Sequence, residues 1–452
     1  MFSSIVKELN NDGDYTYSLN SKMAQSIQLW SSMYENKSPW INNETVFGAN
    51  LPASIAYETA KLVTLEMKSE ISGSPMADFL NGVYRQSVLK NIRNFTELGL
   101  AKGSLIIKPI ASENGMTNQF IQADRFFPMR FDSSGNITKC VFIDRMRKGR
   151  SVYTRLEIHT LKKGLLKIEN RAFRSFDDAN LGNRVNLSEV ESWGDLPEQA
   201  SFSGINKLPF GLFKCPMANQ TDSDSPLGVS VYSRAVGAIK EADKRYSNIC
   251  WEYEATEAAI HIAESMLKYN KENDTYECPQ GRKRLYRAVS TEGGVNEKGL
   301  LDYYLPQIRD TSLFNGWNNQ LRLIEFNCSL AYGTLSNPEN VDKTAEEIKS
   351  SKQRSYTFIA DTQSALQTAL EDWAESAWFW AEIYHLAPNG SYNMAFNWDD
   401  SIIVDADKER SNDRQDVAMG AMPLWEYRAK WYGEDEETAK AMTTDSNSGV
   451  VE

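Results

Sequence analysis

Apolar residues recur three or four positions apart in several stretches of the chain, and they alternate with polar residues in others. Residues 51–73 and 76–98 show the helical spacing, which predicts two helices near the start. After them the period shortens, so SLIIKPI, NQFIQADRFFPMRFD and NITKCVFIDRM predict strands, with Asp132 opening a hairpin turn. Residues 155–173 predict a further hairpin that turns near Lys163. This part of the chain is therefore expected to be α+β.

Helical spacing dominates the second half of the chain. Residues 231–253 keep a 3.6-residue period for about six turns, and Ser230 is available as the N-cap. Residues 309–328 and 342–386 predict two more helices, the second with a long apolar stripe. A strand is expected between the first two of these helices, near residues 260–262.

The C-terminal part predicts shorter elements. The stretch FNWDDSIIVD indicates a strand. From Asp405 onward, two short helices are expected, broken at Gly433, and the acidic residues 434–437 suit the positive end of the second. The last residues, TTDSNSGVVE, are expected to be disordered.

A polar stretch, SLAYGTLSNPENVDKTAEEI at residues 329–348, precedes the longest predicted helix. Asp342 or Asn340 can accept hydrogen bonds from free amides at the helix start, and the acids at 346 and 347 suit its positive end. Helix capping therefore explains the second half of this stretch. It does not explain the Gly- and Asn-bearing first half.

Composition narrows the class of protein. A chain of 452 residues is long enough for two or three domains. Its 41% hydrophobic and 24% charged content are those of a folded protein. The net charge of −12 argues against a protein that coats nucleic acid, because phosphate binding needs clustered cations. It is compatible with a protein that lets DNA pass without holding it.

The cysteines and the apolar runs indicate the compartment. Five Cys, an odd number with no CxxC pair, suit a reducing environment and argue against a disulfide framework or a zinc ribbon. No apolar run approaches the roughly 20 residues that span a bilayer, and the N-terminus lacks the features of a secretory signal. We therefore expect a cytosolic protein, and no cofactor is indicated.

Candidate catalytic residues are few. The three His lie in unrelated segments without metal-ligand spacing, and neither a Walker A loop nor a GxSxG elbow occurs. Asp399, Asp400 and Asp405 could hold Mg²⁺ for phosphodiester chemistry. Because they flank opposite ends of a predicted strand, roughly 13 Å apart, capping and turn roles are favoured. No catalytic or metal site is expected.

A basic run, GRKRLYR at residues 281–287, lies between two predicted helices. Such a run is usually solvated surface. In an acidic chain, an interface with protein or DNA is an equal alternative. The residues that would supply the charge are Arg282, Lys283, Arg284 and Arg287.

Three stretches, in this order along the chain, resemble portal proteins of tailed bacteriophages, the head-to-tail connectors of siphophage type. The sequence LPFGLFKCPMANQTDSDSPLGVSVYSRAVGAIKEADKRYS resembles the stretch leading into the family's first stem helix, most specifically at Asn219 and residues 225–230. The GTLS loop followed by KTAEE resembles the tunnel loop and its following helix. The tail resembles the family's ending at Asp413, Asp416, Gly420 and Tyr427.

The resemblance implies an α+β portal fold with a mixed α/β wing, a two-helix stem, a small α/β clip, a long helix after a tunnel loop, and a short helical crown. The first part of the wing would be residues 1–228. The remaining parts would be stem helices at 229–259 and 307–328, the clip at 260–306, the tunnel loop at 329–342, the long helix and the rest of the wing at 343–404, and the crown at 405–452.

The resemblance also implies a non-enzymatic protein that forms a dodecameric ring at one capsid vertex of the virion, assembled in the host cytoplasm. DNA would pass through an axial channel during packaging and ejection. The partners would be double-stranded DNA, the terminase large subunit, a head–tail adaptor, and major capsid and scaffolding proteins, with no membrane. Aromatic residues would be buried between subunits.

The site residues implied by the resemblance fall in two places. The basic run would form the clip interface. With no cation before Lys343, the tunnel loop would contact DNA through neutral polar groups. A metal-dependent phosphodiesterase, or a capsid or adaptor component without a DNA channel, are the alternatives. The DNA-facing residues would be Gly333, Thr334, Leu335, Ser336, Asn337 and Lys343.

Overall fold

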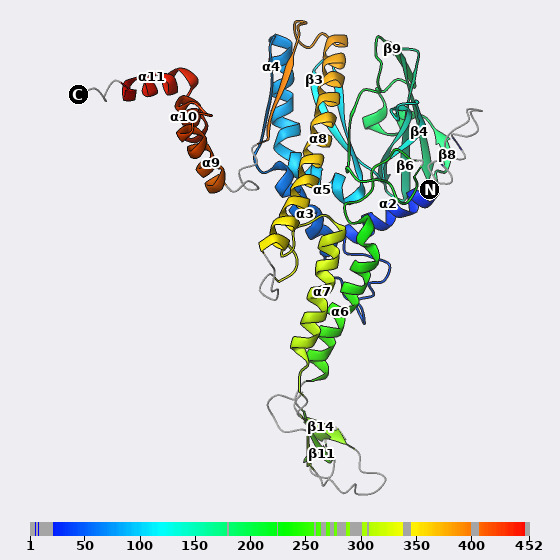
Figure 1. Cartoon of the computed structure of the whole chain (residues 1–452). Helices are drawn as coiled ribbons and strands as arrows, with labels where there is room; N and C mark the ends of the chain where they lie inside the picture. Colours follow the sequence, from blue (N-terminus) through cyan, green and yellow to red (C-terminus); the bar gives the residue numbers. More distant parts are fainter. Residues whose placement is uncertain are drawn as a thin grey trace. The chain divides into compact units, whose positions relative to one another are not determined.

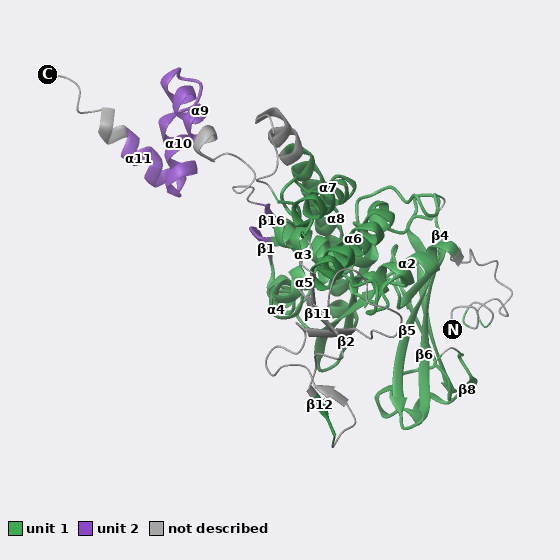
Figure 2. Ribbon diagram, turned by 90° about the horizontal axis from the view of Figure 1, so that it is seen from below, with its two compact units in different colours: residues 1–64, 71–394 green, residues 65–70, 395–452 purple. Residues whose placement is uncertain are grey.

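The computed structural model describes most of the 452-residue chain as two compact units (Figure 2). Unit 1 comprises residues 1–64 and 71–394, and unit 2 comprises residues 65–70 and 395–452. The residues described are Ile5, Glu8, 21–178, 180–223, 225–256, 259–263, 268–271, 275–277, 286–289, 301–304, 307–337, 345–398 and 406–447.

The long helix α8 (Ala345–Ile383) packs across a small antiparallel sheet in unit 1 (Figure 1). The sheet has the order β10 (Gly211–Lys214), β2 (Ser104–Ser112), β3 (Gly115–Gln122). Strand and helix approach closely, because a Cβ on Gly211 would lie 2.0 Å from the carbonyl oxygen of Ala369. The buried stripe of α8 keeps the helical spacing and includes Ile359, Leu366, Leu370, Trp373, Ala377 and Trp380.

Four shorter helices pack beside this layer. α4 begins at an N-cap, Ser74, whose hydroxyl accepts from the Ala77 amide at 3.2 Å. α5 ends at Gly103, which takes the left-handed conformation at φ +88°. The bounds are α2 (Ser21–Tyr34), α3 (Leu51–Thr64), α4 (Pro75–Val83) and α5 (Ile92–Lys102), with a π-helical turn at Tyr84–Val88 and a 3-10 turn at Leu89–Asn91.

A second, larger antiparallel sheet of unit 1 has six strands. Five follow the order β4-β5-β6-β7-β8, and β9 also pairs with β7. One cluster of buried side chains on it includes Val141, Leu156, Ile158 and Phe173, of which Leu156 and Ile158 lie two residues apart on the same face of β6. The strands are β4 (Phe126–Phe131), β5 (Ile137–Lys148), β6 (Ser151–Lys162), β7 (Leu165–Ser175), β8 (Asn183–Val185) and β9 (Gln199–Ser203). Two 3-10 turns, Leu187–Glu189 and Glu191–Trp193, lie between β8 and β9, and a third, Ser233–Ala235, directly precedes the next helix.

Two helices of unit 1, α6 (Val236–Ala255) and α7 (Asp310–Asn327), run side by side as a hairpin (Figure 1). Short strands lie between them in the chain. β11 pairs in parallel with β14 and antiparallel with β15, and β12 pairs with β13. Their bounds are β11 (Ala259–Ala263), β12 (Lys268–Asn270), β13 (Thr275–Glu277), β14 (Tyr286–Val289) and β15 (Leu301–Tyr304).

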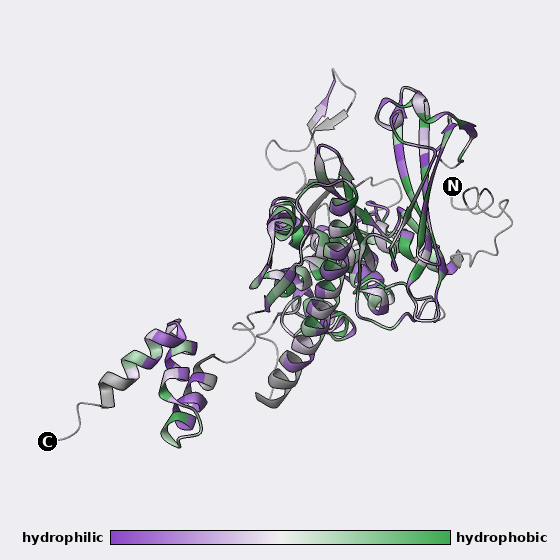
Figure 3. Cartoon of the chain, turned by 90° about the horizontal axis from the view of Figure 1, so that it is seen from above, coloured by the Kyte–Doolittle hydropathy of each residue, from purple (hydrophilic) through white to green (hydrophobic). Residues whose placement is uncertain are grey.

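Unit 2 joins a two-stranded sheet to a helical tail. β1 (Met67–Ser72) pairs with β16 (Asn393–Trp398), and the tail contains α9 (Ala406–Ala418), α10 (Leu424–Tyr432) and α11 (Glu436–Asn447). Hydrophilic residues predominate in the tail helices, with few hydrophobic ones between them (Figure 3). The tail is held by polar contacts, since Asp413 accepts from Trp431 Nε1 at 2.7 Å and Tyr427 OH accepts from Arg410 and Arg414 at 3.2 and 2.9 Å.

The structure confirms the predicted mixture of helices and strands, the hairpins at Asp132 and Lys163, and the strand near residues 260–262. It corrects the first helix, which ends at Thr64, because the following residues form β1 and pair with a distant strand. The helix predicted from residue 231 begins at Val236. Ser230 is not its N-cap, because its hydroxyl accepts from the Tyr232 amide ahead of the helix.

The tail also differs from the prediction. Gly433 does break it, at φ +67°, but a second break at residues 419–423 makes α9 and α10 separate helices. α11 extends to Asn447, so the first part of TTDSNSGVVE is helical, and residues 448–452 lie outside the described part. The tail is therefore more helical than its composition indicated.

Candidate functional site

The α6–α7 hairpin is fixed by polar contacts between the two helices. Arg245 donates to the Gly316 carbonyl oxygen at 2.9 Å. Nearer the ends that face the short strands, Arg309 donates to both carboxylate oxygens of Glu252, at 2.9 and 2.7 Å. The hydrogen bonds from Arg309 lower the pKa of the Glu252 carboxyl, which therefore remains charged at neutral pH. These contacts set the register of the two helices.

Large apolar side chains project from both helices of the hairpin into solvent. Trp251 is 63% exposed, and Phe326 is 54% exposed although it contacts one cation. By contrast, Trp30, Trp193 and Trp373 are buried within the single chain. The expectation that aromatic residues are buried between subunits is therefore wrong for these three. The exposed apolar residues of the hairpin are Trp251, Tyr253, Phe314, Leu323 and Phe326.

The chain after α7 folds back onto the end of that helix around Glu325. Glu325 Oε1 accepts hydrogen bonds from the backbone amides of Gly333, Leu335 and Ser336, at 3.1, 2.6 and 2.9 Å. Its Oε2 accepts from the Ser336 hydroxyl at 2.8 Å. Glu325 is completely buried, so these donors replace the water that its charge would otherwise bind.

Two further contacts hold the same segment. The Asn337 amide donates to Oδ1 of Asn318, which lies two helical turns before Glu325 on α7, at 2.7 Å. From α8, Arg354 donates to the Leu330 carbonyl oxygen at 3.2 Å, and its guanidinium lies 4.8 Å from the centre of the Phe326 ring. Sequence reasoning missed Arg354, because it lies beyond the loop in the chain and reaches it only through the fold.

Five of the six predicted DNA-facing residues therefore lie in a folded turn. Ser336 is buried, and Thr334 Oγ1 donates to the Ala331 carbonyl oxygen at 2.6 Å. The backbone amides of four of these residues, 333 and 335–337, are hydrogen-bonded to side chains of α7. Contact with DNA stays a prediction for the whole set. Of that set, Gly333, Thr334, Leu335, Ser336 and Asn337 lie in the described part, and Lys343 lies outside it.

The motif at residues 225–230 forms the junction between the small sheet and α6. Gly228 crosses Gly103 so closely that a Cβ on Gly228 would lie 2.1 Å from the Gly103 carbonyl oxygen. Its amide donates to Ser104 Oγ at 3.2 Å, and Asn219 Nδ2 donates to the Leu227 carbonyl oxygen at 3.2 Å. These contacts give a packing reason for the residues that carried the resemblance.

The two charged clusters singled out in the sequence are mostly beyond the described residues. Arg282, Lys283 and Arg284 lie outside them, and Arg287 is placed only as a backbone position of β14, paired with His261 of β11. Asp399, Asp400 and Asp405 also lie outside the described residues. Among the residues that are described, no group of three His, Cys, Asp or Glu is placed to hold a metal ion.

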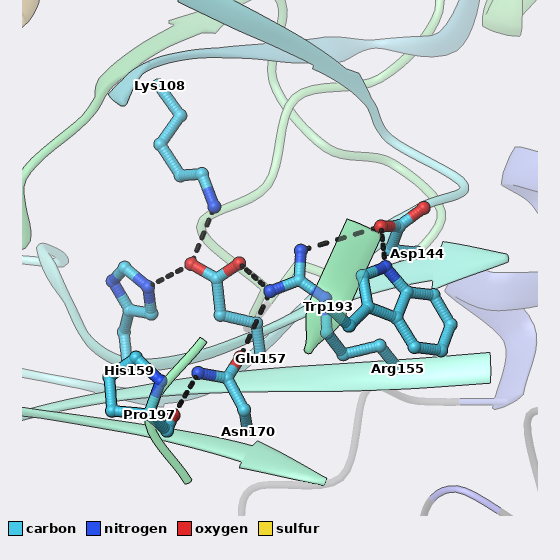
Figure 4. A network of polar contacts seen from close by, with 8 residues as sticks. All are labelled: Lys108, Asp144, Arg155, Glu157, His159, Asn170, Trp193 and Pro197. Atoms are coloured by element: carbon cyan, nitrogen blue, oxygen red, sulfur yellow. Dashed lines mark hydrogen bonds and ion pairs between the residues drawn. The ribbon is translucent and has the colours of Figure 1, made fainter. Parts of the chain in front are cut away.

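A buried polar network lies on the six-stranded sheet (Figure 4). Glu157 is its centre. One carboxylate oxygen contacts Lys108 Nζ at 2.6 Å and His159 Nε2 at 2.7 Å, and the other contacts Arg155 at 3.2 Å. Arg155 in turn donates to Asn170 Oδ1 at 3.0 Å. Arg155, Glu157 and His159 alternate with Leu156 and Ile158 along β6, and this period of two was a sequence signal for the network.

The network fixes the protonation states of its members. Burial raises the pKa of the Glu157 carboxyl, but Lys108, His159 and Arg155 together outweigh burial and hold it well below its usual range. Burial lowers the pKa of His159, although Glu157 opposes that effect. At neutral pH the carboxylate is therefore charged and the imidazole neutral, with its Nε2 proton directed at Glu157.

A cavity of about 410 Å³ adjoins this network. Its lining includes Lys108, Glu157 and His159 together with Trp193 and Trp380. The charges of Lys108, Arg155 and Glu157 that line the cavity are paired with one another.

The three buried thiols are not activated as nucleophiles. Burial raises the pKa values of the Cys140, Cys215 and Cys328 thiols, which remain protonated at neutral pH. The structure gives these thiols no thiolate character at neutral pH.

Comparison with known proteins gives one family. A family model described as phage portal protein, SPP1 Gp6-like, matches residues 50–448. No curated protein sequence matches the chain significantly. The matched range contains the α6–α7 hairpin, the turn around Glu325, α8 and most of the helical tail.

Proposed function

The chain belongs to the SPP1 Gp6-like family of phage portal proteins, and from that premise we propose that it forms a dodecameric ring at one capsid vertex and conducts viral DNA. Family membership gives a portal role and a place in the virion capsid. The match over residues 50–448 is the observation that carries the proposal. Among the described residues, no helix is long and apolar enough to cross a membrane.

The exposed apolar residues of the hairpin support assembly into a ring. In a ring each subunit uses two different faces, one toward each neighbour. Here α6 offers Trp251 and Tyr253, and α7 offers Phe314 and Phe326. Covering these faces with neighbouring copies would contribute roughly 25 cal/mol for each Å² of apolar surface removed from water.

The charge of the chain supports a channel that DNA slides through. With a net charge of −12, the ring as a whole repels phosphate, which disfavours tight gripping of a moving duplex. We assign residues 329–342 as the tunnel loop, α6 and α7 as the stem, and the strands between them as the clip that docks the terminase motor and the head–tail adaptor. The helical tail would be the crown.

The first experiment is electron microscopy of the purified protein with native mass spectrometry. We expect closed rings with twelve subunits and an axial channel. A protein that stays monomeric at high concentration would overturn the proposal. The variant Trp251→Glu with Phe326→Glu should lose ring assembly, because charges would have to be buried between subunits, whereas Glu254→Gln on the exposed part of α6 should assemble normally.

The phosphodiesterase alternative gains no support within the described part of the chain. Its three candidate ligands, Asp399, Asp400 and Asp405, lie outside that part. Mg²⁺-dependent nuclease activity that is lost in Asp400→Ala would nevertheless reverse the non-enzymatic assignment.

A further inference from the structure

We propose that Glu325 is a positioning residue that locks the first half of the tunnel loop onto the stem helix α7, so that residues 329–337 move with α7 as one body. The inference rests on the proposed function, because it assigns this segment to the DNA channel. It goes beyond that function by naming the side chain that sets the position of the loop.

The position of Glu325 in its helix is the first argument. α7 ends at Asn327, so Glu325 lies in the last turn, where the helix dipole disfavours a negative charge. The sequence nevertheless places a carboxylate there, and the fold buries it completely. An unfavourable site of this kind is expected only where other groups stabilise the charge strongly.

The backbone of the turn supplies that stabilisation. Three amides within four residues, those of Gly333, Leu335 and Ser336, converge on a single carboxylate oxygen at 2.6–3.1 Å. Amides that converge in this way form an anion-binding nest, and hydrogen bonds to a charged acceptor are about twice as strong as neutral ones. The Ser336 hydroxyl occupies the second oxygen at 2.8 Å.

A second tie comes from the same face of α7. Asn318 lies seven residues before Glu325, two helical turns away, and accepts from the Asn337 amide at 2.7 Å. Both side chains are buried, so solvent does not compete for these contacts. A shift or rotation of α7 is therefore transmitted to the loop backbone at two points.

Hydrogen exchange of the assembled ring tests the lock directly. In Glu325→Ala the amides of Gly333, Leu335 and Ser336 should exchange about tenfold faster or more than in the parent protein. Ser336→Ala removes the hydroxyl, which donates to Glu325 at 2.8 Å and accepts from the Gly333 amide at 3.2 Å, but leaves the three amide contacts to Glu325 Oε1. It should therefore give a smaller increase, which keeps the test open if Glu325→Ala assembles poorly. Glu254→Gln, an exposed glutamate on α6, is the matched control and should leave these amides unchanged. Unchanged exchange in both loop variants would overturn the proposal.

DNA retention in phage particles assembled with each variant tests the consequence. With Glu325→Ala, a smaller fraction of normally sized heads should be filled with DNA than with the parent or the Glu254→Gln control. The filled particles should also lose their DNA earlier. Faster exchange with unchanged packaging and retention would also overturn the positioning role. Deletion of residues 334–337 tests the tunnel-loop assignment separately from the role of Glu325. If that deletion leaves DNA packaging and retention intact, the segment is not a tunnel loop, whatever the role of Glu325.

Discussion

Replacing Glu157 by Gln tests the energetics of the buried network on the six-stranded sheet. The substitution keeps the shape of the side chain and removes its charge. Lys108 would then lose the carboxylate that contacts it at 2.6 Å, and Arg155 would lose the one at 3.2 Å while keeping a longer contact to Asp144 at 3.5 Å. Their side chains are 5% and 11% exposed, so bulk water replaces the lost partner only in part.

The expected cost follows from this geometry. Removing one partner of a buried ion pair destabilises a protein by about 3–5 kcal/mol. Part of the cost is relieved, because Lys108 Nζ lies 4.6 Å from the centre of the Phe142 ring and Arg155 keeps its hydrogen bond to Asn170. We therefore expect about 3 kcal/mol, the lower end of that range.

Urea unfolding followed by circular dichroism measures the change. Glu58→Gln is the matched control, since Glu58 contacts Lys61 at 3.4 Å in a partly exposed pair and should cost less than about 1 kcal/mol. Adding Lys108→Met to Glu157→Gln removes one stranded cation and should recover part of the loss. A Glu157→Gln protein within about 1 kcal/mol of the parent, or a double variant that recovers nothing, would refute the reasoning.

Three further predictions concern pH, packing and docking. Burial lowers the pKa of His159, so below about pH 6.5 the unfolded chain binds a proton that the folded chain does not, and the free energy of unfolding should fall as pH drops. In His159→Gln, urea titrations should show a weaker dependence of this free energy on pH. An unchanged dependence would contradict the role given to His159. Gly228→Ala places a Cβ 2.1 Å from the Gly103 carbonyl oxygen and should lower the free energy of unfolding, measured by calorimetry, by about 1–3 kcal/mol. Gly237→Ala, where a Cβ has open space, should leave it unchanged. Arg282→Glu with Arg284→Glu should weaken binding of the terminase motor or the adaptor in pull-down assays without changing ring assembly; equal binding would return the run to solvated surface.

The sequence was informative where one period persists over many residues. The stripe of α8 appears in the structure much as its spacing predicts, and β5 and β6 form where the sequence predicts strands. It was misleading after Thr64, because Met67 begins β1, whose pairing partner β16 lies more than three hundred residues later, and local spacing carries no trace of that partner. Ser230 failed as an N-cap for a similar reason, since the chain first makes a short turn against α5.

The turn around Glu325 could not be predicted because its donors are backbone amides, which every residue carries. The polar residues of GTLSN, through the resemblance, suggested a loop that contacts DNA. Their side chains gave no sign that a carboxylate on the preceding helix would accept hydrogen bonds from the loop amides. One signal was available: an acidic residue in the last turn of a helix opposes the helix dipole and needs an explanation. Arg354 had no comparable signal in the sequence.

The hairpin leaves and re-enters one folded body at buried points, Tyr232 before α6 and Cys328 after α7. The elements before the hairpin in the sequence, from α3 to β10, and the helix after it, α8, pack into one hydrophobic layer. A protease cut after the exposed Lys271 would therefore divide the chain into two fragments that each carry part of that layer. The fragments should remain associated without a covalent link, and the two pieces, expressed separately, should complement each other into a nicked but complete subunit.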